Sequence, residues 1–235
     1  MSEPADYTPR DWNAHPPYLT PEYKSTRLRA PKQRLLPLPQ TLSEMTGPLF
    51  GHNDMQPGDD DLTHVPGSTA EAVGERIVVS GRVLDQAGRP VPNTLIEVWQ
   101  CNAAGRYNHD WDQHDAPLDP NFQGTGRCVT DDEGRYSYVS IRPGAYPWGN
   151  HENAWRPPHI HLSLFGPSFL TRLVTQMYFQ GDPLLPLDPI FNGVPAQSRD
   201  LLVASYDHEL TRPDFALGWR FDIVLRGRNA TPMEN

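Results

Sequence analysis

The sequence contains few cysteines. Among its 235 residues only Cys101 and Cys128 are cysteine, too few for a disulfide framework, and the two do not form a CxxC motif. Disulfides are also rare in reducing compartments. We therefore expect reduced thiols and a cytoplasmic protein.

Positive charge and long apolar runs are scarce as well. The 20 Lys and Arg residues face 29 Asp and Glu residues, a net charge of −9, which disfavours nucleic acid as a partner. No apolar stretch approaches the roughly 20 residues needed to cross a bilayer. The first residues are acidic and interrupted by Pro4, unlike a signal peptide. Nucleic-acid binding, membrane spanning and secretion are therefore not expected.

Proline and glycine are abundant instead. The 26 Pro and 18 Gly residues nearly exclude long helices, while aromatic residues at 10% argue against a wholly disordered chain. Composition changes near residue 75, because prolines interrupt residues 1–74 at short intervals while aromatic and apolar residues still recur there. We expect residues 1–74 to be an extended arm that wraps over the body or a partner, and residues 75–235 to be one β-rich domain.

Short strands dominate the prediction for residues 75–235. Alternating or β-branched runs bounded by Gly and Pro predict strands, and they lie at 76–84, 94–100, 135–141, 158–165, 172–179 and 219–226. Helices are predicted only at 196–206 and, from the capping-box spacing of Thr41 and Glu44, at 42–45. The expected fold class is all-β, an antiparallel β-sandwich with long loops and few short helices.

Two histidines lie in one predicted strand. Because side chains alternate along a strand, His159 and His161 emerge on one face, and Ile160 and Leu162 on the other. Such a pair has the geometry of metal ligands. Two half-exposed strand histidines without a ligand would have the same pattern.

Two tyrosines follow stiff turns near this strand. Tyr146 lies in the sequence P-G-A-Y-P-W at residues 143–148, where Pro-Gly indicates a type II turn and the following proline forces Tyr146 to be extended. Tyr107 follows a Gly-Arg pair just beyond a predicted strand. Tyrosines held in this way either pack for structure or point at a ligand, and the spacing leaves both possibilities open.

A longer set of positions resembles the signature of the intradiol ring-cleavage dioxygenases. It comprises V-S-G-R-V-L at residues 79–84, I-E-V-W-Q at 96–100 and G-R-Y at 105–107. Downstream, the motif around Tyr146 and the sequence W-R-P-P-H-I-H at 155–161 resemble the rest of that family's iron site. The resemblance extends over nearly the whole chain and implies a sandwich of the transthyretin type.

The resemblance implies a mononuclear non-haem Fe(III) cofactor. Its implied ligands are Tyr107, Tyr146, His159 and His161, completed by a solvent hydroxide. Phenolate is a hard, anionic donor that suits Fe(III), whereas an Fe(II) oxygenase would need a carboxylate beside two histidines. Asp131, Asp132 and Glu152 are near enough in sequence to supply one, although D-D-E-G at residues 131–134 is typical of a solvated turn.

The resemblance also implies roles around the metal. Tyr146 would leave the iron when substrate binds and accept a proton, and Arg156 and Gln176 would assist catalysis. The implied substrate-binding residues are Tyr23, Trp148, Arg156 and Ile190. Ordinary packing is the alternative for each of these side chains.

The activity implied is cleavage of protocatechuate by O2 between its two hydroxyl-bearing carbons, within the β-ketoadipate pathway of aromatic catabolism. The first 74 residues do not resemble the helical N-terminal domain of the catechol-cleaving members. All four implied iron ligands are present in the sequence, so we expect a catalytic chain. The resemblance also implies assembly with a homologous alpha chain into a hetero-oligomer. A homo-oligomeric catechol or hydroxyquinol dioxygenase is an alternative. A β-sandwich that binds small aromatics without catalysis is another.

Overall fold

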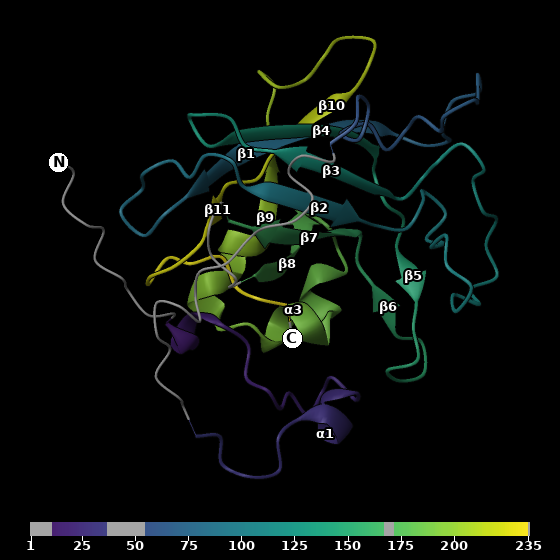
Figure 1. The fold of residues 1–235 in the computed structure, drawn as a ribbon. Helices are drawn as coiled ribbons and strands as arrows, with labels where there is room; N and C mark the ends of the chain where they lie inside the picture. The colour runs from purple at the N-terminus through teal and green to yellow at the C-terminus, as the bar shows by residue number, and fades with distance from the viewer. Residues whose placement is uncertain (1–10, 37–54, 167–171, 235) are drawn as a thin grey trace, which may run out of the picture.

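Strands carry most of the regular structure (Figure 1). The structure, a computed structural model, describes residues 11–36, 55–166 and 172–234. Its strands are β1 (Arg76–Leu84), β2 (Leu95–Trp99), β3 (Thr125–Val129), β4 (Arg135–Ile141), β5 (Tyr146–Pro147), β6 (Trp155–Arg156), β7 (His159–Phe165), β8 (Leu173–Phe179), β9 (Val203–Tyr206), β10 (Leu217–Arg220) and β11 (Ile223–Val224). The short helices are η1 (Trp12–Ala14), α1 (Thr26–Arg29), η3 (Leu185–Leu187), α3 (Pro189–Gly193) and η4 (Ala196–Leu202). The helix expected at 42–45 lies outside the described residues.

One large mixed sheet contains all of these strands except β5 and β6, which pair with each other in a separate two-stranded sheet. Its order is β11-β1-β10-β9-β8-β7-β2-β3, and β4 pairs with β1. The expectation of a mostly β fold with few short helices is confirmed, but the strands are not all antiparallel, because β1 is parallel to β10 and β11, and β8 is parallel to β9. The connection from β8 to β9 carries three short helices, and a crossover of this length is what allows two neighbouring strands to run in the same direction.

Two of the predicted elements each correspond to two separate elements in the structure. The helix expected at 196–206 is helical only in η4, because Val203 and Ala204 pair with β8 as strand β9. The strand expected at 219–226 is interrupted between β10 and β11, where the Phe221 carbonyl oxygen accepts a hydrogen bond from the Tyr136 hydroxyl at 2.6 Å. Strands β3, β5 and β6 were not predicted. In each case a tertiary partner, rather than local propensity, decides the conformation.

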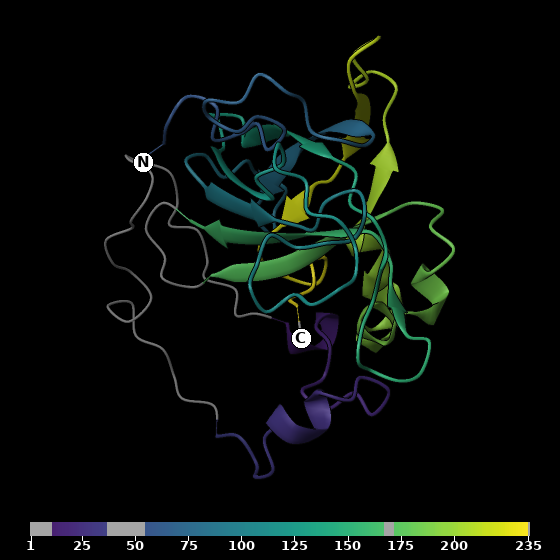
Figure 2. The ribbon, with the colours of Figure 1, turned by 90° about the vertical axis from the view of Figure 1, so that its right-hand side faces the viewer.

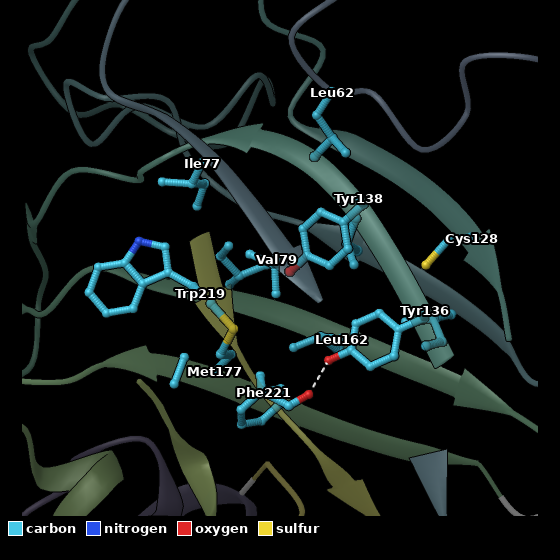
Figure 3. Packing of buried hydrophobic residues seen from close by; sticks show 14 of the residues in the cluster. Leu62, Ile77, Val79, Cys128, Tyr136, Tyr138, Leu162, Met177, Trp219 and Phe221 are labelled. Carbon is cyan, nitrogen blue, oxygen red and sulfur yellow. Dashed lines mark hydrogen bonds between the residues drawn. The ribbon is translucent and has the colours of Figure 1, made fainter. Parts of the chain in front are cut away.

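The main core lies between the β1–β4 pair and the β2–β7–β8 layer, and Figure 3 shows the side chains meeting there. The buried members that the figure labels are Leu62, Ile77, Val79, Cys128, Tyr136, Tyr138, Leu162, Met177, Trp219 and Phe221. Leu62 comes from the segment before β1, and its N–H donates to the Val139 carbonyl oxygen of β4 at 2.9 Å. The core therefore includes residues from before position 75.

The two cysteines are both free and buried. Burial raises the pKa of Cys101 to about 12, and likewise that of Cys128. Both therefore remain neutral thiols at ordinary pH.

Residues 11–36 lie along one side of the body, below the short helices in Figures 1 and 2. Lys24 N–H donates to Asn150 Oδ1 at 2.8 Å, and the Asn150 amide returns a hydrogen bond to the Glu22 carbonyl oxygen at 2.8 Å. At the other end of this segment, Met233 N–H donates to His15 Nδ1 at 2.9 Å. The segment thus contacts both the loop after β5 and the C-terminal residues. None of the described helices is long and apolar enough to cross a membrane.

Gly81 of β1 tests how closely this strand packs against the backbone at Phe221. A Cβ atom at position 81 would overlap the Phe221 backbone carbonyl, whereas one at Gly149 would meet no heavy atom within 4 Å. We expect Gly81→Ala to lower the free energy of unfolding by about 1–3 kcal/mol, and Gly149→Ala to change it by less than about 0.5 kcal/mol. Urea unfolding of both variants measures this. Equal stability of the two would contradict the close approach of β1 to Phe221.

Candidate metal centre

Four side chains with donor atoms converge beside β7. The Tyr107 hydroxyl lies 3.2 Å from His161 Nε2, and the Tyr146 hydroxyl lies 3.3 Å from His159 Nε2. The two tyrosine rings meet edge to face with centroids 5.6 Å apart, and the two imidazole centroids are 4.9 Å apart. The structure therefore brings together the four residues that the sequence suggested as ligands.

Strand β7 places the two histidines. Ile160 and Leu162 are fully buried in the core, so alternation along the strand directs His159 and His161 to the opposite face. The register with β8 sets His159 opposite Tyr178 and His161 opposite Gln176. The alternation expected from the sequence, with both histidines on one face and Ile160 and Leu162 on the other, is therefore present in β7.

Two glycines allow the tyrosine-bearing loops to approach one another. Gly105 has a positive φ of 80°, and a Cβ there would overlap the Ala145 carbonyl oxygen. A Cβ at Gly144 would overlap the Ala103 carbonyl oxygen. Only residues without a side chain fit at these crossings. The turn before Tyr146 and the turn before Tyr107 consequently lie against each other.

Hydrogen bonds orient both imidazoles. His159 Nδ1 lies 2.6 Å from the Pro157 carbonyl oxygen, and His161 Nδ1 lies 3.0 Å from Glu234 Oε2. Because each oxygen is an acceptor, we assign the proton to Nδ1 in both rings. This leaves both Nε2 lone pairs directed towards the tyrosine hydroxyls. A second hydrogen bond that fixes the tautomer in this way is characteristic of metal-binding histidines.

Burial disfavours the charged forms of three of the four donors in the protein alone. It raises the pKa of Tyr107 well above the usual value and raises that of Tyr146, while it lowers the pKa of His159 well below its usual value. Two neutral imidazoles and two phenols that become anionic when they bind a metal form a hard O/N donor set. This donor set fits a mononuclear, highly charged cation such as Fe(III).

The carboxylate alternative finds no support in the described residues. Asp131 Oδ1 accepts hydrogen bonds from the backbone N–H groups of Glu133 and Arg135, in the turn at the start of β4, whereas Tyr146 follows the other end of that strand. Glu152 is exposed. Within 11–36, 55–166 and 172–234, no three His, Cys, Asp or Glu side chains are grouped so as to hold a metal ion.

Arg156 places a buried cation beside the centre. Its Nε lies 3.3 Å from Asp188 Oδ2, and one terminal nitrogen donates to Gln176 Oε1 at 2.5 Å and to the Tyr178 hydroxyl at 3.2 Å. Burial opposes the charge, but Tyr178 and Asp188 hold the pKa of the guanidinium above its ordinary value. The guanidinium therefore stays protonated at ordinary pH, paired with the Asp188 carboxylate.

The remaining predicted site residues lie on two sides of Arg156. Trp148 has Arg156 over its ring at 5.6 Å and contacts Tyr23 with ring centroids 5.5 Å apart. Ile190 is buried in α3, and it lines a small cavity together with Gln176 and Tyr178. Tyr23 thus contacts Trp148 from residues 11–36, while Ile190 lines a cavity with Gln176 of β8.

Four residues of the centre were not predicted from the sequence. Trp99 stacks on His161 with centroids 4.9 Å apart and planes 6° apart. Tyr178 and Asp188 bond to Arg156, and Glu234 bonds to His161. Period-two spacing from Gln176 could have identified Tyr178, and the Asp-Pro pair that begins α3 marks Asp188 as a helix cap. Nothing local marks Trp99 or Glu234.

Comparison with known proteins agrees with this arrangement. The family model described as "Dioxygenase" matches residues 45–227, and that of the "Protocatechuate 3,4-dioxygenase beta subunit N terminal" matches residues 8–41. The chain is 59% identical over 234 residues to the protocatechuate 3,4-dioxygenase beta chain of Burkholderia cepacia, with all of both chains covered. It is 29% identical over 201 residues to the alpha chain from the same organism, covering 83% of this chain and 96% of that one.

A solved structure supports the fold. The crystal structure of 3-chlorocatechol 1,2-dioxygenase from Rhodococcus opacus 1CP superimposes with a TM-score of 0.55 at 24% identity, covering 77% of this chain and 70% of that chain. At this identity the likeness concerns the fold alone. Together, the match of the dioxygenase family over most of the chain and the full-length relative at 59% identity show that this chain belongs to the intradiol ring-cleavage dioxygenase family.

Proposed function

We propose that this chain is the catalytic subunit of an enzyme that cleaves protocatechuate (3,4-dihydroxybenzoate) with O2 to 3-carboxy-cis,cis-muconate. The observation that carries the proposal is the convergence of Tyr107, Tyr146, His159 and His161 in a chain 59% identical to a beta chain of protocatechuate 3,4-dioxygenase. The likeness to both subunit types of that enzyme supports assembly with a homologous alpha chain.

Tyr107, Tyr146, His159 and His161 would hold the cofactor, a single non-haem Fe(III). When bound, the ferric ion supplies a Lewis-acidic centre that withdraws electron density from a catecholate and prepares its ring for O2. Two phenolates balance most of the 3+ charge, which is what a buried site of low dielectric requires.

Tyr146 is the proposed base. Burial raises the pKa of its phenol, so the Tyr146 phenolate would be a strong base, able to accept a proton from a substrate hydroxyl. The β5–β6 pairing sets Tyr146 opposite Arg156 and keeps the ring near the site after its oxygen is protonated. Tyr107, with its oxygen at His161 Nε2, remains in place as a ligand.

Arg156 and Gln176 are the proposed catalytic partners. The guanidinium places positive charge beside the substrate ring, where it stabilises negative charge that develops on carbon. Gln176 Oε1 accepts from both Arg156 and the Tyr178 hydroxyl, which holds the guanidinium in position. Tyr23, Trp148 and Ile190 are proposed as walls of the substrate pocket.

We also propose the finer architecture on which this function rests. Residues 1–74 would form the arm, with its later part around Leu62 packed into the core, and residues 75–235 the catalytic domain, in a cytoplasmic hetero-oligomer. Contacts of Lys24 and Glu22 with Asn150 support an arm that covers the site. Placement of the core between the β1–β4 pair and the β2–β7–β8 layer supports a sandwich of the transthyretin type.

Oxygen uptake tests the activity. The iron-loaded chain, co-expressed with its alpha chain, is expected to consume one O2 per protocatechuate and to release 3-carboxy-cis,cis-muconate, which mass spectrometry identifies. Faster turnover of catechol or hydroxyquinol by the chain alone would favour the homo-oligomeric alternative. Retained iron without uptake on any catechol would exclude a dioxygenase.

Tyr107→Phe tests the ligand set. A ferric tyrosinate absorbs visible light, so loss of this phenolate should weaken the red-brown band. Outer-shell partners of metal sites are worth ~10–100-fold in affinity, and removal of a ligand should weaken iron retention by at least as much. Absorbance spectra and iron analysis after incubation with a chelator measure both effects. Tyr206→Phe, which alters a half-exposed tyrosine of β9, is the control, and equal behaviour of the two variants would remove Tyr107 from the set.

Arg156→Lys tests the buried cation. Lysine keeps the charge but cannot reproduce the fork of donors that contacts Asp188, Gln176 and Tyr178. We expect iron and colour to be retained while kcat/KM falls about 10–100-fold. Arg135→Lys, at the exposed start of β4, should leave kcat/KM unchanged. Wild-type kcat/KM in Arg156→Lys would show that the guanidinium geometry plays no part in turnover.

A further inference from the structure

The last described residues, 230–234, are built into the body of the protein. Ala230 and Thr231 are 1% exposed, and Thr231 exchanges two hydrogen bonds with Val224 at 2.8 and 3.0 Å. The Thr175 hydroxyl donates to the Pro232 carbonyl oxygen at 2.7 Å, and Glu234 N–H donates to the Val174 carbonyl oxygen at 2.8 Å. This segment therefore follows β8, the strand that lies next to the two histidines.

This path delivers one carboxylate to the metal centre. Glu234 Oε2 lies 3.0 Å from His161 Nδ1, although 73 residues separate the two in the sequence. Gln176, which lies across the register from His161, lines the same small cavity as Glu234, and Trp99 stacks on the imidazole face. The His161 ring is thus held at its face and at its outer nitrogen.

The two histidines are supported by different chemistry. The outer nitrogen of His159 meets a neutral carbonyl oxygen two residues away, whereas that of His161 meets a carboxylate. A carboxylate acceptor fixes the imidazole tautomer and also makes the opposite nitrogen more basic. His161, whose Nε2 faces Tyr107, therefore has the stronger hydrogen-bond acceptor of the two histidines.

We propose that Glu234 is a positioning residue for the metal centre: by accepting the His161 Nδ1–H it keeps Nε2 directed at the site and strengthens it as a ligand. The proposal rests on the iron site proposed above. Backbone and Thr175 hydrogen bonds already attach the segment to β8 and β11, so the carboxylate is not needed to hold the segment itself.

Iron retention measures the effect on the site. In the complex loaded with iron, Glu234→Ala should release iron to a chelator about 10–100-fold faster and shift the visible band. Glu234→Gln should lie between wild type and alanine, because its amide oxygen still accepts the hydrogen bond but carries no charge. Glu133→Gln, which removes a carboxylate from an exposed ion pair with Arg135, is the matched control and should match wild type. Iron release by Glu234→Ala at the wild-type rate would overturn the proposal.

The histidine tautomer measures positioning without any metal. Long-range ¹H–¹⁵N spectra of the full, metal-free chain with labelled histidine should show His161 protonated at Nδ1 in wild type and a mixture of tautomers in Glu234→Ala. His159 should be unchanged and serves as the internal reference, and thermal unfolding confirms that the variants fold. An unchanged His161 tautomer in Glu234→Ala would overturn the proposal. Absence of a ferric tyrosinate band in wild type would instead overturn the iron site, while the tautomer comparison still reports on Glu234.

Discussion

Alternation along β7 is the constraint on which the centre depends. The strand has to bury Ile160 and Leu162 in the main core while it presents His159 and His161 to the opposite side. A shift of the register by one residue would exchange the two sets, placing imidazoles in the core and leaving the donor site without ligands. The same pairing that stabilises the fold therefore aligns the histidines with β8 and its polar side chains.

One buried ion pair lies beside the centre. Burial disfavours charge on Tyr107, Tyr146 and His159 in the protein alone, while Arg156 remains cationic within its bonds to Asp188 and Gln176. Breaking a buried ion pair by removing one partner is strongly unfavourable, so Asp188 and Arg156 depend on each other. The network holds the cation close to the reacting groups and prevents it from moving to solvent.

Local patterns in the sequence predicted most strands and placed His159 and His161 on one face, whereas the ligand roles of the histidines and tyrosines came from the family resemblance. Alternation, glycine and proline carry this information, and each acts over a few residues. Parallel pairing of β1 with β10 and the conversion of residues 203–206 to a strand depend on partners far along the chain, which no local pattern encodes. Glu234 and Trp99 were missed for the same reason, because their roles are defined by contacts with His161 and not by their neighbours in sequence.

The parallel pairing of β1 also has a kinetic consequence. Ile77 faces Leu217 across the sheet, and Arg82 N–H bonds to Asp222 over 140 residues of chain. Contacts of such high sequence separation are completed only after a large loss of chain entropy, which slows folding. During synthesis β1 and β4 can pair once residue 141 has been made, but the other edge of β1 stays open until residues 217–224 are made. Over that interval the nascent chain exposes an unpaired apolar strand edge, the kind of surface that chaperones recognise and that drives aggregation.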